Sequence, residues 1–429
     1  MKFNLKSDKL PFESPFYYGW VIVFISALGV MLSGPGQTYS VSIFIDSFIE
    51  DLGWSRSLVS LLYSGGTLLA GLTVPFVGRL FDKYGHRKIM TLVAFVFGIS
   101  LLAISFVFTP LMLFVGFYFI RLLGQSSMVI GPSTIVPKWF SEKRGRALSL
   151  MSMGGRVGAA AFPLLNTWII AAFGWRTGWR GWAILIWLVM TPLAWFLVRE
   201  KPEAVGLEME EGLKKKEENS TADNSETKAD LKKVNVTAES KTLAEARRTS
   251  AFWLLLFCIF VPAMVGTGLT FHIVSIMGER GLSPDAAAFT LSVMAVVSFP
   301  ATFFAGFVLE KITVRKLLII IFTIYSISVI WLINIQNMTM ALIFGVLYGL
   351  IQGFHRVNVN MIWPSYFGLK HLGSIRGASQ LGGVIGAALG PFPIGFAYDY
   401  FGGYTEILWL MFIFPVLAVA AAYFARVPE

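Results

Sequence analysis

The chain has 429 residues; 55% are hydrophobic, 14% are charged, and the net charge is +10. Because soluble domains carry about 25% charged residues, this composition argues against a soluble enzyme and excludes a disordered chain. The apolar share of about 236 residues nearly equals the ~240 that twelve membrane helices of about 20 residues require. We therefore expect an all-α membrane protein, not an enzyme.

Apolar runs separated by short polar segments follow one another along the chain. They fall near 17–45, 56–80, 89–108, 111–136, 146–173, 180–198, 251–277, 286–308, 317–335, 339–365, 375–398 and 405–426. Runs of this length are typical of membrane helices, and those above 25 residues indicate tilted helices. The pattern predicts twelve transmembrane helices.

One long polar interruption, from Arg199 to Arg248, is rich in both signs of charge and predicts a flexible cytoplasmic linker. It divides the chain into an N-terminal six-helix bundle (1–198), the linker (199–248) and a C-terminal six-helix bundle (249–429). Lysine and arginine gather in loops that would share one side of the membrane. These loops are Gly78–Lys88, Lys138–Arg146, Glu310–Lys316 and Gly368–Arg376. The positive-inside rule then predicts a multi-pass protein of the plasma (inner) membrane with both termini cytoplasmic, and it explains the basic excess without nucleic acid.

The two predicted bundles repeat one another in sequence. Matching residues recur at an offset of 228 positions, as in the pairs Gly78 and Gly306, Asp82 and Glu310, Arg87 and Arg315, and Gly154 and Gly382. A constant offset through five helices indicates a parallel repeat, which transporters use for alternating access.

The segment Gly78–Lys88 between the second and third runs resembles the GxxxD(R/K)xGxR(R/K) motif of the major facilitator superfamily. The resemblance covers the whole chain and implies two pseudo-symmetric bundles around a central cavity. Asp82 at a helix end would pair with basic residues and a helix N-terminus, forming a latch that breaks in another conformation. The latch residues are Gly78, Asp82, Gly85 and Arg87, with Glu310 and Arg315 in the degraded second copy. The alternative is a tight turn whose charges only set orientation.

Three arginines lie deep in apolar runs: Arg121, Arg156 and Arg356. Each costs about 2.5–3.5 kcal/mol at the centre of a membrane helix, and no carboxylate lies at comparable depth. An anionic ligand would offset this charge. For Arg121 the alternative is a structural role, with hydrogen bonds to first-helix carbonyls; Arg356 could instead be simple inner-side charge.

Other polar side chains in these runs would orient the ligand: Gln37, Tyr39, Gln125, Gln352 and Asn358. His272 and His355 are the histidines of the apolar runs, and either could carry a coupled proton because histidine titrates near neutral pH. A hydrogen-bonded packing role is the alternative for each.

The segments Tyr18–Trp20, Gly36–Ser40 and Trp139–Gly145 resemble bacterial relatives of the monocarboxylate transporter and oxalate:formate exchange families. This resemblance implies transport of small organic anions, often with a proton. The sequence departs from that pattern: the first helix has Gln37, Thr38 and Tyr39 where monocarboxylate transporters have a lysine. The basic residues of oxalate-type carriers in helices eight and eleven are also absent at depth.

No P-loop, HExxH or Cys/His cluster occurs in the sequence, so we expect neither cofactor nor metal. The expected partners are a small organic anion, a proton and the lipid bilayer, and a monomer is expected. Two other functions stay open: an exporter of drugs or amphipathic compounds, and a membrane sensor that transports nothing.

Overall fold

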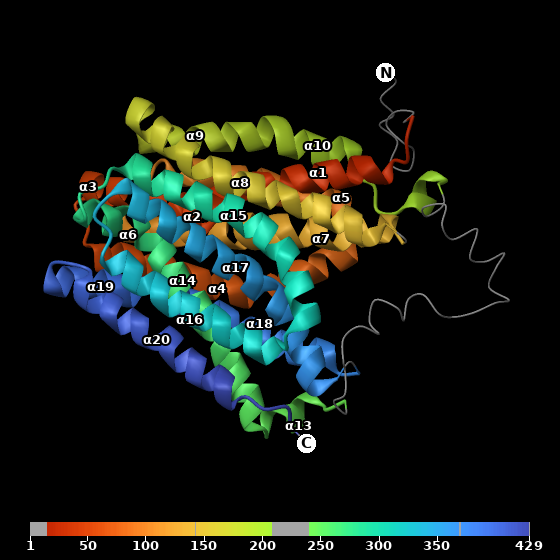
Figure 1. The fold of residues 1–429 in the computed structure, drawn as a ribbon. Coiled ribbons are helices and arrows are strands. Elements are labelled where there is room, and N and C mark those ends of the chain that lie inside the picture. The colour runs from red at the N-terminus through yellow and green to blue at the C-terminus, as the bar shows by residue number, and fades with distance from the viewer. Residues whose placement is uncertain (1–14, 142, 208–239, 369, 429) are drawn as a thin grey trace. The chain divides into compact units, whose positions relative to one another are not determined.

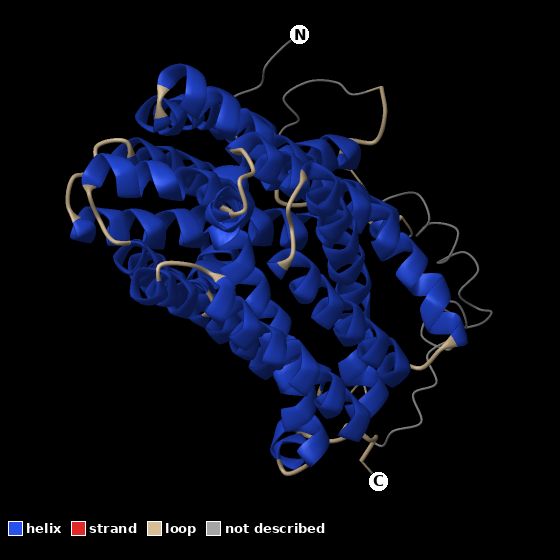
Figure 2. Ribbon diagram, turned by 60° about the vertical axis from the view of Figure 1, so that its left-hand side comes forward, coloured by secondary structure: helices blue, strands red, loops and turns tan. Residues whose placement is uncertain are grey.

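The computed structural model describes residues 15–141, 143–207, 240–368 and 370–428. Within these ranges all regular structure is helical, and no strand occurs (Figure 2). Twelve helical segments are long and apolar enough to cross a membrane, which confirms the predicted count in the described part of the chain.

The first six spans are built from the following elements (Figure 1). They are α1 (Gly19–Leu32) with the 3₁₀ turn η1 (Gly34–Gly36), α4 (Arg56–Tyr84), α5 (His86–Ile104), α6 (Pro110–Phe119) with the π-helix η3 (Ile120–Ser127) and α7 (Met128–Trp139), α8 (Arg144–Phe173), and α9 (Trp175–Leu185) with the π-helix η4 (Ile186–Met190) and α10 (Thr191–Leu197). Between α1 and α4 lie α2 (Thr38–Val41), the 3₁₀ turn η2 (Ser42–Phe44) and α3 (Ile45–Leu52).

The last six spans are more regular. They are α14 (Ser250–Glu279), α15 (Pro284–Lys311), α16 (Val314–Ile333), α17 (Met338–Phe367), α18 (Leu372–Leu389) with α19 (Pro391–Phe401), and α20 (Thr405–Phe424). Polar caps start several of them: Thr249, Ser283, Thr313 and Asn337 each accept a hydrogen bond from a backbone N–H of the first turn. These caps accept hydrogen bonds from backbone N–H groups that would otherwise be unsatisfied at the end of a membrane helix.

The chain divides into two compact units. Unit 1 comprises Met1–Val41 and Leu69–Asn224, and unit 2 comprises Ser42–Leu68 and Ser225–Glu429. Helix α4 therefore begins in unit 2 and ends in unit 1, and Ser42–Leu68 belong to the unit that holds the last six spans.

The predicted sequence repeat has a counterpart in packing, because the same close helix crossing occurs once in each unit. In unit 1 a Cβ on Gly158 of α8 would lie 2.9 Å from the Met31 carbonyl oxygen of α1. In unit 2 a Cβ on Gly386 of α18 would lie 2.7 Å from the Phe260 carbonyl oxygen of α14. Gly158 and Gly386 are 228 positions apart, the offset seen in the sequence. Small residues at both sites allow this approach.

Most of the predicted linker, 208–239, lies outside the described residues. Its first residues pack on unit 1, where the indole Nε1 of Trp139 donates to the Arg199 carbonyl oxygen at 3.1 Å and Pro202 is buried in the 3₁₀ turn η5 (Pro202–Val205). Its last residues form α13 (Leu243–Arg247), begun by a capping box between Thr242 and Glu245.

Candidate functional site

A break in the first span is the most irregular backbone feature of unit 1. Helix α1 ends at Leu32, and the sequence Ser-Gly-Pro-Gly then forms η1 before α2 begins. A Cβ on Gly36 would lie 2.4 Å from the Ile120 carbonyl oxygen and 2.9 Å from Cα of Gly124. The glycines therefore let the broken first span touch the backbone of the fourth.

The fourth span is itself irregular at this crossing, because Ile120–Ser127 is a π-helix. Arg121 within it is 2% exposed, and its Nη1 donates to the Gly36 carbonyl oxygen at 3.3 Å and to Oγ1 of Thr38 at 3.2 Å. Backbone freed by a helix break must find partners inside a membrane protein. This geometry favours the structural alternative for Arg121; direct contact with substrate stays a prediction.

The predicted polar residues of unit 1 lie around this crossing. Gln37 is half-buried and donates from Nε2 to Oγ of Ser33 at 3.1 Å. Gln125 lies in the π-helix next to Gly36 and, like Tyr39, is half-buried. The structure thus brings Gln37, Gln125 and the Arg121 contacts into one region of discontinuous helix, the type of backbone that builds substrate sites in transporters.

Asn166 is a further member that sequence reasoning missed. Its Nδ2 donates to Oγ of Ser40 at 2.8 Å, and its Oδ1 accepts from Nε1 of Trp182 at 2.8 Å. The side chain is fully buried on α8. A lone asparagine inside the apolar run 146–173 was the available signal.

Arg156 lies on α8 between two glycines that pack against α1. A Cβ on Gly154 would lie 1.9 Å from the Ala27 carbonyl oxygen, and Gly158 makes the contact described above. At 100° per residue, Arg156 projects about 160–200° away from both glycines. It is therefore half-buried on the side of α8 that faces away from α1.

In unit 2, α17 carries Gln352 and Arg356 one turn apart, and both side chains are exposed at mid-span. The Nδ1 atom of the neighbouring His355 is buried and has no hydrogen-bond partner in the described structure. Asn358 lies elsewhere: it is fully buried and donates from Nδ2 to the Val314 carbonyl oxygen at 3.2 Å. The structure therefore groups Gln352, His355 and Arg356 and separates Asn358 from them.

His272, the other predicted proton carrier, is a hydrogen-bonded residue of the unit 2 interior. Its Nε2 lies 2.9 Å from the Pro391 carbonyl oxygen and 3.3 Å from Oγ of Ser60, and its Nδ1 lies 3.5 Å from the Tyr404 hydroxyl. Because a carbonyl only accepts, Nε2 carries a proton and Nδ1 is left to accept from Tyr404. Both ring nitrogens of a neutral His272 are thus occupied, beside the break between α18 and α19.

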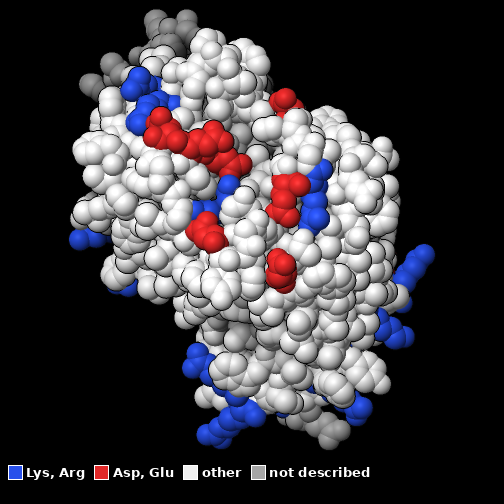
Figure 3. Space-filling view, turned by 90° about the vertical axis from the view of Figure 1, so that its left-hand side faces the viewer, with Lys and Arg blue, Asp and Glu red and all other residues white. Residues whose placement is uncertain are grey.

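Carboxylates gather where the helices of unit 2 end, on the face that Figure 3 views. Those in unit 2 at these ends are Asp46, Glu50, Asp51, Glu279, Asp285, Asp399 and Glu406. Two of them bind the start of α4: Asp399 accepts from the Ser57 backbone N–H at 2.7 Å, and Asp46 pairs with Arg56 at 2.8 Å. This acidic end contrasts with the basic loops that the sequence places on the other side.

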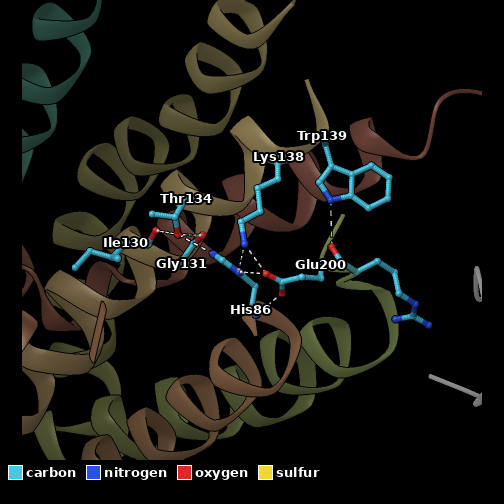
Figure 4. Close-up of polar contacts among 8 residues, drawn as sticks. His86, Ile130, Gly131, Thr134, Lys138, Trp139 and Glu200 are labelled. Carbon is cyan, nitrogen blue, oxygen red and sulfur yellow. Dashed lines mark hydrogen bonds and ion pairs between the residues drawn. The ribbon is translucent and has the colours of Figure 1, made fainter. Parts of the chain in front are cut away.

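At the predicted latch motif, the residue with the most polar contacts is His86, which the sequence did not single out (Figure 4). Its Nδ1 lies 2.8 Å from Oε1 of Glu200 and its backbone N–H donates to Oε2 at 2.5 Å, while Lys138 contacts Oε1 at 2.5 Å. Nε2 of His86 lies 2.8 Å from Oγ1 of Thr134. Burial by itself would raise the pKa of Glu200, but the hydrogen bonds from His86 and Lys138 outweigh it and lower the pKa to about 2.

The predicted latch residues make these contacts within their own units. Gly85 has a φ of +83°, which favours glycine, and Nε of Arg87 donates to the Trp195 carbonyl oxygen at 2.7 Å. Asp82 is exposed, as is Glu310. Arg315 donates from Nη2 to the Tyr423 carbonyl oxygen. A latch that forms and breaks stays a prediction.

A family model described as Major Facilitator Superfamily matches residues 19–298 and 263–429. The chain is 24% identical to Glucose transporter GlcP of Staphylococcus epidermidis, over 94% of this chain and 92% of that protein. It is 23% identical to 4-hydroxybenzoate transporter PcaK of Acinetobacter baylyi, over 95% and 91%.

A third relative, Quinolone resistance protein NorB of Staphylococcus aureus, is 30% identical over 42% of this chain, and this match spans 37% of that protein's length. Among solved structures, a bacterial homolog of the human lysosomal transporter Spinster, inward-facing and unoccupied, superposes with a TM-score of 0.72. It is 16% identical, and the alignment covers 96% of this chain and 98% of that one. At this identity the likeness shows the fold alone.

Proposed function

Because the chain belongs to the major facilitator superfamily, we propose that it is a secondary active transporter of a small organic anion, carried together with a proton by alternating access. The superfamily match gives a membrane transporter of unspecified substrate. The charges of the spans support the finer assignment. The basic loops and the acidic helix ends support an orientation with both termini cytoplasmic in the plasma membrane.

The observation that supports an anionic substrate is the depth in the membrane spans at which acidic and basic side chains occur. In the described spans every acidic residue lies within three residues of a span end: Asp82, Glu279, Asp285, Glu310, Asp399 and Glu406. Arg356, in contrast, is eleven residues from the end of its span. Its side chain has no hydrogen bond or ion pair among the described residues, so a ligand carboxylate would supply the missing negative charge.

We base the proposed roles on the contacts that the residues make within each unit. Arg356 and Arg156 would bind the carboxylate, and Gln352 would orient it. Arg121 would hold the broken first span in place, because its hydrogen bonds go to that span. His355 fits proton coupling better than His272, since Nδ1 of His355 is without a partner while both nitrogens of His272 are occupied.

The relatives define the substrates to compare. Similarity to the 4-hydroxybenzoate transporter supports a carboxylate, and the glucose transporter supplies a neutral competitor. Similarity to the quinolone resistance protein supports a second candidate function, drug export. A non-transporting sensor would exchange none of the three.

The test is uptake by purified protein in liposomes with an acidic external medium. We expect labelled 4-hydroxybenzoate or an aliphatic monocarboxylate to enter, a protonophore to abolish the stimulation, and glucose to be left outside. Arg356→Ala should weaken carboxylate affinity about 10- to 100-fold, the value of one charge-assisted hydrogen bond. Arg156→Ala should abolish uptake. Arg248→Ala removes an exposed arginine outside the spans and should leave uptake unchanged.

Proton coupling is tested separately. His355→Gln should remove the stimulation of uptake by the pH gradient. The folded fraction of His272→Gln should retain this stimulation. Normal uptake by both Arg156→Ala and Arg356→Ala would refute the anion site, and dye efflux that carboxylates do not inhibit would assign the exporter function instead.

A further inference from the structure

A groove of about 630 Å³ runs along the surface of unit 2 between α16 and α20. These two helices pack side by side (Figure 1). The lining is almost wholly apolar, with Ile327, Ile330 and Val416 among its side chains. The two hydroxyls in it, on Thr323 and Ser326, donate to carbonyl oxygens of their own helix at 2.9 Å. Nothing in the groove therefore requires a polar solute.

The length of the groove along α16 is close to the thickness of one leaflet of a bilayer. Its lining on α16 extends from Ile319 to Ile330, a rise of eleven residue steps, which at 1.5 Å per step is about 16 Å. Half of the ~30 Å hydrocarbon core of a bilayer is about 15 Å. Both helices are membrane spans, and Ile327 is 50% exposed, so the groove is open on the surface of unit 2.

Positive charge lies at one end of the groove, where α16 begins and α20 ends. Tyr423 closes this end; its carbonyl oxygen accepts a hydrogen bond from Arg315, whose guanidinium lies 5.5 Å from the centre of its ring. Lys316 and Arg426 are exposed beside them in sequence. In the described part of the chain no carboxylate pairs with any of these three cations, although Glu310 lies at the end of the preceding helix.

We propose that this groove binds an anionic phospholipid, with one acyl chain between α16 and α20 and the phosphate at Arg315 and Lys316. An acyl chain suits walls that offer no polar partner, and each buried methylene favours binding. The phosphate would occupy the remaining guanidinium donors of Arg315, since a basic pocket between membrane helices is a recognised headgroup site. This places the lipid on the basic side of the membrane, the inner leaflet in the predicted orientation.

The first test measures thermal unfolding of the purified full-length protein in detergent with added lipid. Phosphatidylglycerol should stabilise it more than phosphatidylcholine of the same chain length, and inorganic phosphate should have no effect. Native mass spectrometry should then show about fivefold weaker phosphatidylglycerol binding for each cation lost in Arg315→Ala and Lys316→Ala. The matched control is Arg247→Ala/Arg248→Ala, which removes two exposed charges elsewhere in unit 2 and should leave lipid binding unchanged.

The chain site is tested with Ile327→Trp, which adds volume at an exposed position and so leaves the buried core intact. It should displace both lipids, while Arg315→Lys, which keeps the charge, should retain the preference for phosphatidylglycerol. Equal stabilisation by the two lipids, or equal loss in the control double variant, would overturn the proposal. Stabilisation by inorganic phosphate equal to that by phosphatidylglycerol would do so as well, because it would show that no acyl chain is needed.

Discussion

Replacing Glu200 by glutamine tests whether the polar cluster at the end of the sixth span stabilises unit 1. The pKa of Glu200 falls from 4.5 to about 2, although burial alone would raise it, because His86 and Lys138 donate hydrogen bonds to its carboxylate. Since one pKa unit corresponds to about 1.36 kcal/mol, a difference of 2.5 corresponds to about 3.4 kcal/mol of folding free energy. The Glu200 side chain is 35% exposed, so solvent screening reduces this to about 1.5–2 kcal/mol.

The sign of the pH dependence follows from the direction of the shift. A carboxyl group whose pKa is lower in the folded state stabilises the protein above the unfolded value, near 4.5, and this contribution is lost as the pH falls toward 2. Near neutral pH the contribution is complete. In a thermal-shift assay in detergent, Glu200→Gln should therefore lower Tm by about 3–8 °C near pH 7, and the difference should shrink below about pH 4.5.

The control is Glu203→Gln, three residues away in η5, where the side chain is exposed. It should leave Tm unchanged. A double-mutant cycle with Lys138→Met should show coupling, since Nζ of Lys138 lies 2.5 Å from Oε1 of Glu200. If Glu200→Gln unfolds at the same temperature as the wild type at neutral pH, the cluster contributes nothing to stability and the reasoning fails.

Three further substitutions probe the helix crossings by thermal unfolding. Gly36→Ala places a Cβ 2.4 Å from a backbone oxygen of the π-helix and should cost about 1–3 kcal/mol, with loss of transport; an unchanged Tm would show that the two spans separate freely. Gly154→Ala should destabilise similarly, whereas Gly145→Ala in the same helix, with open space around it, should not; equal effects would rule out a steric cause. His272→Gln should cost about 1–3 kcal/mol, because it removes the imidazole that contacts the Pro391 carbonyl oxygen and the Tyr404 hydroxyl, and a stable variant would argue against this packing role.

The twelve spans could be predicted because about 20 apolar residues in succession have one stable structure in a bilayer. The Glu200 cluster could not be predicted from the sequence, since a carboxylate in a charged stretch has the same local sequence whether it is solvated or paired. Its partner His86 is 114 residues away in the sequence, and only the tertiary structure brings the two residues together. The glycines and the proline of Ser33–Gln37 weaken a helix wherever they occur, but the contact of Gly36 with Gly124 depends on the packing of two spans.

The separation of Asn358 from Gln352 and Arg356 could have been predicted from the sequence. Gln352 and Arg356 are four residues apart and share a face of α17, whereas Asn358 lies two residues beyond Arg356, about 200° around the helix. It therefore points toward the Val314 carbonyl oxygen and away from the proposed anion site. Arg121 is the opposite case, because residue type and depth are the same as for Arg356 and only the tertiary contacts distinguish them.

The two arginines show two ways in which a membrane helix tolerates a cation, and a paired substitution separates them. Arg121 donates to backbone and hydroxyl groups of the broken first span, so Arg121→Leu should leave those acceptors without partners and cost about 1.5–3 kcal/mol. Arg356 has no such bonds among the described residues, so Arg356→Leu removes a costly charge and should leave Tm unchanged or raise it, while carboxylate affinity falls about 10- to 100-fold, as for Arg356→Ala. Thermal unfolding of both variants, each beside its uptake assay, measures the contrast. If Arg356→Leu is as unstable as Arg121→Leu, the side chain serves the fold, and the anion must be bound elsewhere.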